Sequence, residues 1–104
     1  MEEENLETNA ITLEKNNIKE KLPKKYKVLM YNDDFTTMEF VVAVLIEIFN
    51  KTIDEANYIM IEVHNKGIGI AGVYPFDIAI SKLNKAQALA RKEGFPFKLT
   101  VEEE

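Results

Sequence analysis

The apolar and polar positions divide the chain into a polar arm and one domain. Residues 1–25 are rich in Glu, Asn and Lys and contain only scattered Leu and Ile, a composition typical of a flexible N-terminal arm. Three later segments, 26–31, 68–74 and 97–101, contain mostly β-forming residues, and each predicts a strand. The last three residues, 102–104, form an acidic tail.

Two capping motifs predict where the first two helices begin. A T-x-x-E motif runs from Thr36 to Glu39, in which the threonine would cover the N3 amide and the glutamate would reach back to the cap's own N–H. It predicts a helix over about 37–50. The same motif at 52–55 predicts a second helix over about 53–65, which a Lys-Gly pair would end.

A third helix is expected from Pro75, whose fixed φ suits the first turn of a helix. Asp77 would lie favourably at the positive end of this helix, and Gly94 would end it. The elements then follow in the order β-α-α-β-α-β, which indicates an α+β domain over 26–101.

The helix expected over 37–50 is apolar on almost every side, whereas a surface helix usually shows one apolar stripe. A domain of about 80 residues rarely encloses a helix completely. The pattern leaves two alternatives open: either neighbouring elements cover both sides, or one side lines a groove. The next helix offers a matching stripe at i, i+3, i+4 and i+7, formed by Ala56, Ile59, Met60 and Val63.

Composition and charge argue against several classes of function. The chain has 104 residues, no cysteine, 46% hydrophobic residues and a net charge of −5. Without cysteine there are no disulfides, no thiol catalysis and no thiolate zinc sites, so we expect a cytoplasmic protein. Segment 26–101 carries nine acidic and eight basic residues without a basic stripe, which argues against nucleic-acid binding. The longest apolar run, 40–46, is shorter than the roughly 20 residues that span a bilayer, and we expect no signal peptide.

Four polar residues near the apolar helix are candidates for chemistry. Asn32, Asp33 and Asp34 precede the helix, and His64, the only histidine, borders the stripe of the next one. Their oxygen and nitrogen acceptors could bind a metal, perform acid–base catalysis or hold a ligand ammonium. The three loop residues could equally form a solvated turn, and the histidine could be structural. The spacing matches no known metal site and the chain has no G-x-S-x-G motif, so an ammonium beside an apolar pocket, without metal or cofactor, is the economical interpretation.

Three stretches resemble one known family. "YNDDFTTMEFVVAVL", "IMIEVHNKG" and "GVYPFDIAISK" are similar to the ClpS family, the adaptors that bring N-degron proteins to Clp-type AAA+ proteases. The resemblance covers roughly residues 24–101 in continuous register. It implies a two-layer sandwich in which a small three-stranded antiparallel sheet packs against three helices. It also implies an adaptor, not an enzyme, that is monomeric when free.

The resemblance implies binding of free N-termini whose first residue is large and hydrophobic: Leu, Phe, Tyr or Trp. The α-amino group would be held by Asn32, Asp34 and His64, with Asp33 beside them. The pocket for the side chain would be lined by Thr36, Met38, Val41, Met60, Val63 and Phe97. Because Phe97 stands where the family commonly has Leu, its larger ring could narrow the pocket and disfavour Trp.

A second surface, around the third helix, would contact the N-terminal domain of a ClpA- or ClpC-like unfoldase. The family carries such contacts at the positions of Tyr74, Asp77 and Lys82, although Pro75 replaces a hydroxyl cap there. The rival hypothesis is an interaction domain whose apolar helix binds a partner helix, as in ribosomal stalk-type domains. It would need no role for the four polar candidates.

Overall fold

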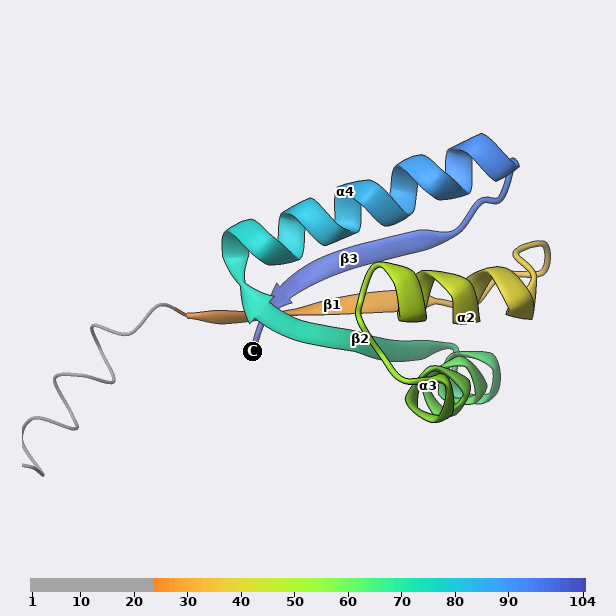
Figure 1. Cartoon of the computed structure of the whole chain (residues 1–104), viewed down its shortest axis with the longest axis horizontal. Helices are drawn as coiled ribbons and strands as arrows, with labels where there is room; N and C mark the ends of the chain where they lie inside the picture. The colour runs from red at the N-terminus through yellow and green to blue at the C-terminus, as the bar shows by residue number, and fades with distance from the viewer. Residues whose placement is uncertain (1–23) are drawn as a thin grey trace, which may run out of the picture.

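The computed structural model describes residues 24–104, so the predicted arm lies outside the described part except for its last two residues. The elements, in chain order, are β1 (Lys25–Tyr31), α2 (Met38–Glu47), α3 (Ile53–Lys66), β2 (Ile68–Pro75), α4 (Phe76–Glu93) and β3 (Lys98–Glu103) (Figure 1). This order is the one predicted. The last strand extends beyond its predicted end, so the first two residues of the acidic tail belong to β3.

The three strands form one antiparallel sheet in the order β2-β1-β3. The register against β3 pairs Tyr26 with Glu103 and Tyr31 with Lys98. On the other side of β1, the register against β2 shifts between Val28 and Leu29, which marks a local bulge. The expectation of a small antiparallel sheet is thereby confirmed.

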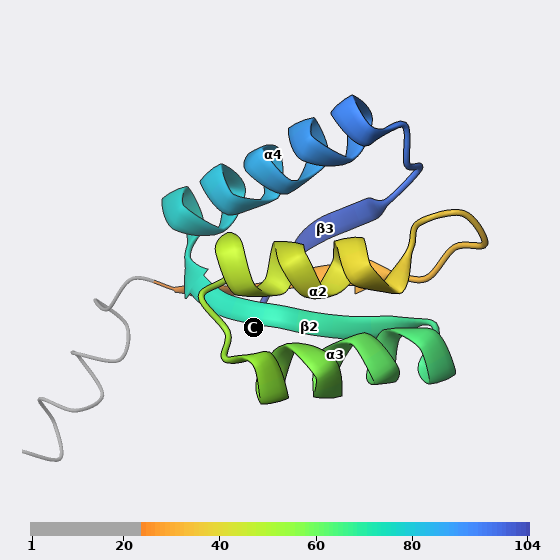
Figure 2. The same cartoon turned by 45° about the vertical axis from the view of Figure 1, so that its right-hand side comes forward.

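The helices and the sheet form two layers. The two views show α2 lying between α4 and α3 over the sheet, with α3 alongside β2 (Figure 2). On the central strand, Val28 and Met30 belong to the core cluster and Leu29 between them does not, as the two-residue period of a strand requires. The largest fully buried side chains come from β1 and from α2 with the residues that follow it: Phe49, Met30, Leu45, Val28 and Val44.

The start of α2 differs from the prediction by one residue. Thr37 is the N-cap, and its hydroxyl accepts a 3.1 Å hydrogen bond from the amide of Phe40. The predicted capping box at Thr36 is wrong because the hydroxyl of Thr36 donates to Asp33 instead. In α3 the predicted box is present: Thr52 and Glu55 exchange hydrogen bonds of 2.9 and 3.1 Å.

The chain reverses tightly after each of the first two helices. Asn50, beyond the end of α2, has a φ of 58°, in the left-handed region that asparagine tolerates. Gly67 ends α3 with a φ of 87°, where only a residue without a Cβ is unstrained. None of the helices between residues 24 and 104 is both long and apolar enough to cross a membrane.

Candidate functional site

The loop after β1 is tied to the end of α3. The backbone amide of Asn32 donates a 3.0 Å hydrogen bond to the carbonyl of Gly67. Gly67 in turn donates to the carbonyl of Val63, closing the last turn of α3. One short chain of hydrogen bonds therefore places the Asn-Asp-Asp loop next to the helix turn that carries His64.

Asp33 folds the loop through its own carboxylate. One oxygen accepts hydrogen bonds from the amides of Phe35 and Thr36 at 2.8 and 2.7 Å, and the other accepts one from the Thr36 hydroxyl at 2.7 Å. Burial acts to raise the pKa of Asp33, but the hydrogen bonds from Thr36 and Phe35 together lower the pKa below its ordinary value of 3.8. The carboxylate is thus ionised and engaged within the loop.

The close packing of α3 on β2 sets the floor of the site. Val63 is 3% exposed and lies directly against Gly69 of β2. A Cβ built on Gly69 would stand 2.7 Å from the Val63 Cγ2. Glycine at this position therefore allows the strand to approach the helix closely.

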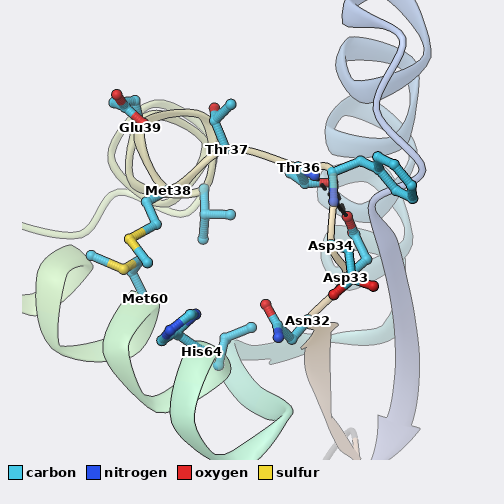
Figure 3. A pocket seen from close by; sticks show the side chains of 12 residues that line it. Asn32, Asp33, Asp34, Thr36, Thr37, Met38, Glu39, Met60 and His64 are labelled. Atoms are coloured by element: carbon cyan, nitrogen blue, oxygen red, sulfur yellow. Dashed lines mark hydrogen bonds between the residues drawn. The ribbon is translucent and has the colours of Figure 1, made fainter.

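These elements enclose a pocket of about 480 Å³ at the N-terminal end of α2 (Figure 3). Its size falls in the usual range for small-ligand sites, roughly 300–1,000 Å³. It is lined by nine of the ten residues predicted to form the site: Asn32, Asp33, Asp34, Thr36, Met38, Val41, Met60, Val63 and His64. Segments far apart in the sequence thus meet at one site.

Three further lining residues were missed by the sequence analysis: Phe35, Thr37 and Glu39. Thr37 and Glu39 lie at the start of α2, which begins later than the predicted capping box implied. Phe35 is 73% exposed and belongs to none of the apolar stripes or motifs identified in the sequence. Only the correct position of the helix cap would have pointed to Thr37 and Glu39.

The pocket has a polar side and an apolar side. The side chains of Asn32 and His64 lie on the polar side, and those of Met38 and Met60 approach each other from α2 and α3 (Figure 3). The pocket is lined by Asn32, Asp34 and His64. Between residues 24 and 104, no hydrogen bond to another side chain or to the backbone involves these three side chains, so their acceptors have no protein donor in the described part. Over the same range, no group of three or more His, Cys, Asp or Glu residues could hold a metal ion.

Phe97 is the one predicted pocket residue that is not among those lining the cavity. It is 4% exposed and packs edge-on against Phe40, with ring centroids 5.9 Å apart. Phe95 packs against the same ring at 5.0 Å. Because Phe97 belongs to the core and not to the pocket lining, the structure gives no support to the expectation that its ring narrows the pocket.

Two of the three residues predicted for the second surface meet at the far end of α2. The ammonium of Lys82 donates to the carbonyl of Ile48 at 2.5 Å and to Asn50 at 2.9 Å, and lies 5.2 Å from the ring centroid of Tyr74. The Tyr74 hydroxyl donates to the carbonyl of Phe49 at 3.3 Å, and burial raises its pKa above the ordinary 10.0.

Asp77, the third of these residues, is exposed in the first turn of α4. It lines a shallow depression with Lys24, Tyr26, Pro75 and Phe76. Lys82 and Tyr74 therefore both contact the end of α2, whereas the Asp77 side chain makes no hydrogen bond or ion pair with another residue of the described part.

Comparison with known proteins agrees with this geometry. A family model described as "ATP-dependent Clp protease adaptor protein ClpS" matches residues 21–100. The chain is 55% identical over 91 residues to the ClpS adapter of Clostridium acetobutylicum, covering 84% of this chain and 90% of the relative. It is 53% identical over 81 residues to that of Lawsonia intracellularis, covering 78% of this chain and 74% of the relative.

A solved structure shows the same fold. Agrobacterium tumefaciens ClpS2 bound to L-phenylalaninamide superposes with a TM-score of 0.76 and 38% sequence identity, covering 80% of this chain and 100% of the other. The chain belongs to the ClpS family of ATP-dependent Clp protease adaptors. Its relatives are named as adaptors, which describes a binding protein that serves a protease.

Proposed function

We propose that this protein binds the free N-termini of proteins whose first residue is large and hydrophobic and delivers them to a Clp-type AAA+ unfoldase in the cytoplasm. The observation that carries the proposal is the composition of the pocket, in which unengaged acceptors face an apolar cavity. L-phenylalaninamide, the ligand of the similar Agrobacterium protein, has a free α-amino group, a benzyl side chain and a neutral amide. It therefore resembles an N-terminal phenylalanine whose carboxyl group is joined by a peptide bond to the rest of a chain.

The α-amino group would lie among Asn32, Asp34 and His64. An ammonium has three donors and requires three acceptors when it leaves water. The three side chains supply a carboxylate, an amide oxygen and an imidazole nitrogen, and none is used elsewhere in the described structure. Asp33, whose oxygens are engaged by Thr36 and Phe35, supports this set by shaping the loop.

The first side chain would fill the space between Met38, Val41, Met60 and Val63. Methionine side chains are flexible and adapt to apolar groups of different shape, which suits Leu, Phe, Tyr and Trp alike. Burial of one such side chain contributes roughly 1.5–3 kcal/mol and each charge-assisted hydrogen bond about 1.5–3 kcal/mol. Because ordering the peptide end takes back several kcal/mol, we expect a dissociation constant on the order of micromolar.

Delivery would use the second surface. Asp77 is exposed at the start of α4, close to Tyr74 and Lys82 in the chain, at the opposite end of α2 from the pocket. A partner bound there would leave the pocket open, so the adaptor could hold a substrate and an unfoldase at the same time. We propose that this partner is the N-terminal domain of a ClpA- or ClpC-like unfoldase.

Fluorescence anisotropy with labelled peptides tests the proposal directly. Peptides that differ only in the first residue should bind when it is Leu, Phe, Tyr or Trp, and should not bind when it is Ser, Lys or an N-acetylated Leu. Acetylation removes the charge and donors of the α-amino group while leaving the leucine side chain in place. Equal binding of the free and acetylated leucine peptides would refute the assignment of the polar side.

Two variants separate the site from general effects of charge. Asp34→Asn preserves the shape of the side chain but removes its charge, and should weaken binding about tenfold or more, as expected for a charged hydrogen bond. Glu93→Gln removes the same charge from an exposed position in the last turn of α4 and should leave the affinity unchanged. A partner-helix domain, the rival function, would show no dependence on the first residue or on Asp34.

A further inference from the structure

A second hollow continues the groove between α2 and α3 beyond the pocket. Its volume is about 430 Å³, and its own lining residues are Val42, Ala43, Ile46 and Asn57. It shares Met38, Glu39 and Met60 with the pocket. The two methionines, which approach each other across the groove (Figure 3), therefore form a ridge between two adjoining depressions.

Residues that line the two depressions follow one another along α2 at a spacing close to that of an extended peptide. Val42 lies one turn beyond Met38 on α2, about 6 Å along the helix axis at 1.5 Å per residue. In an extended chain, side chains alternate sides, and residues two apart on the same side are separated by roughly 6.6–6.8 Å. When the first side chain is in the pocket, the third points toward the same surface, one step further along the groove, whereas the second points away.

The second hollow is mainly apolar. Val42, Ala43 and Ile46 are each half-buried, so each leaves part of its surface open to water. Asn57 provides the polar edge on α3 and is exposed. An apolar side chain lying in this hollow would cover these surfaces, whereas a polar side chain would lose water without gaining partners.

We propose that this hollow binds the side chain of the substrate's third residue and favours an apolar side chain there. The inference rests on the proposed function, because the register is counted from a first residue held in the pocket. It extends the recognition element from one residue to a pattern of two, at positions one and three. Proteins that begin with the same residue would then be bound with different affinities.

Four peptides of equal length and charge test the register with the full chain. All begin with Leu, and they have Ala-Ala, Ala-Leu, Ala-Asn or Leu-Ala at positions two and three. We expect the peptide with Leu at position three to bind about fivefold more tightly than its Asn counterpart, which is similar in size but polar. The peptide with Leu at position two has the same composition as the peptide with Leu at position three, but it should bind like the Ala-Ala peptide.

Two variants locate the effect in the hollow. Ala43→Glu and Asn57→Glu each place a carboxylate in it, and both positions suit glutamate as a helix former. Each should remove the difference between the Leu and Asn peptides, and thermal unfolding monitored by circular dichroism confirms that the variants are folded. Since the readout is a ratio of affinities for one protein sample, a small loss of active protein does not affect it.

The outcomes distinguish the two proposals. If all four peptides bind equally, or if Leu at position two gives the gain, the third-residue site is overturned while the proposed function stands. If the difference persists in both variants, the site lies elsewhere and the assignment to this hollow is overturned. If no peptide that begins with Leu binds, the proposed function fails and this inference fails with it.

Discussion

The amide of Asn32 lies 3.0 Å from the carbonyl of Gly67, and this hydrogen bond joins the loop after β1 to the last turn of α3. The two residues are far apart in the sequence, yet the bond aligns the Asn-Asp-Asp loop with the helix that carries His64. Gly67 has a left-handed conformation and ends α3, and its carbonyl accepts the hydrogen bond from the loop. The polar side of the pocket therefore depends on a backbone contact as much as on its own side chains.

The role of Met38 in selectivity can be tested by truncation. Met38 lines the pocket and is 46% exposed, and we expect its thioether to crowd a ligand branched at Cβ. Met38→Ala should admit peptides that begin with Val or Ile, raising their affinity about tenfold, and should weaken Leu peptides slightly through lost contact. Peptide anisotropy measures both. Ile78→Ala, at an α4 position that is also 46% exposed, should change neither; continued rejection of Val and Ile by Met38→Ala would contradict the gating role.

The Asp33 carboxylate should make stability depend on pH. Its pKa is lowered in the folded state, so the unfolded chain binds more protons as pH falls, and folding is favoured above the ordinary pKa of 3.8. Asp33→Asn should cost about 1–2 kcal/mol at neutral pH through weakened hydrogen bonds. The difference from wild type should persist down to about pH 4 and shrink as pH falls through the folded-state pKa, as urea unfolding at several pH values would show. A difference that is the same at pH 7 and pH 3 would contradict this assignment.

The order of the elements could be predicted from the sequence because each has a local signal. The capping box of Thr52 and Glu55 and the stop at Gly67 act within a few residues of the helix ends they define. The start of α2 was misplaced because Thr36 and Thr37 are adjacent hydroxyl residues, and either could serve as the cap. The competing partner, the Asp33 carboxylate, decides between them through a hydrogen bond to Thr36.

The candidate site was predicted only in part. Motifs on the loop, α2 and α3 pointed to the acceptors and the methionines, which the structure brings together at one pocket. The position of Phe97 depends on the packing of its ring against Phe40, a long-range contact that has no sequence signal. The resemblance assigns Phe97 to the pocket by its position in the family, and in the structure its ring is buried against that of Phe40.

The close approach of Gly69 to Val63 predicts a coupled effect of substitution. A Cβ at position 69 would lie 2.7 Å from the Val63 Cγ2, with the carbonyl of Ile59 at 3.5 Å. Gly69→Ala should therefore force Val63 or α3 to shift, costing roughly 1–3 kcal/mol of stability and weakening peptide binding at the pocket floor. The double variant Gly69→Ala with Val63→Ala should recover part of the loss, because the smaller side chain makes room. If urea unfolding shows that the stability losses of the two single variants simply add in the double variant, the methyl group added at position 69 does not press on Val63.

A variant of Lys82 tests the surface at the end of α2 independently of the pocket at its start. Lys82→Met retains the apolar stem of the side chain but leaves the carbonyl of Ile48 and the side chain of Asn50 without their donor, which should cost about 1–2 kcal/mol of stability. Peptide affinity should stay within about twofold of wild type, since Ile48 lies at the opposite end of α2 from Met38. Binding to the N-terminal domain of the unfoldase, measured by calorimetry, should weaken at least fivefold if this surface is the contact. Lys85→Met, which removes an exposed ammonium further along α4, provides the control; an equal loss of unfoldase binding in both variants would point to net charge, not to Lys82, as the cause.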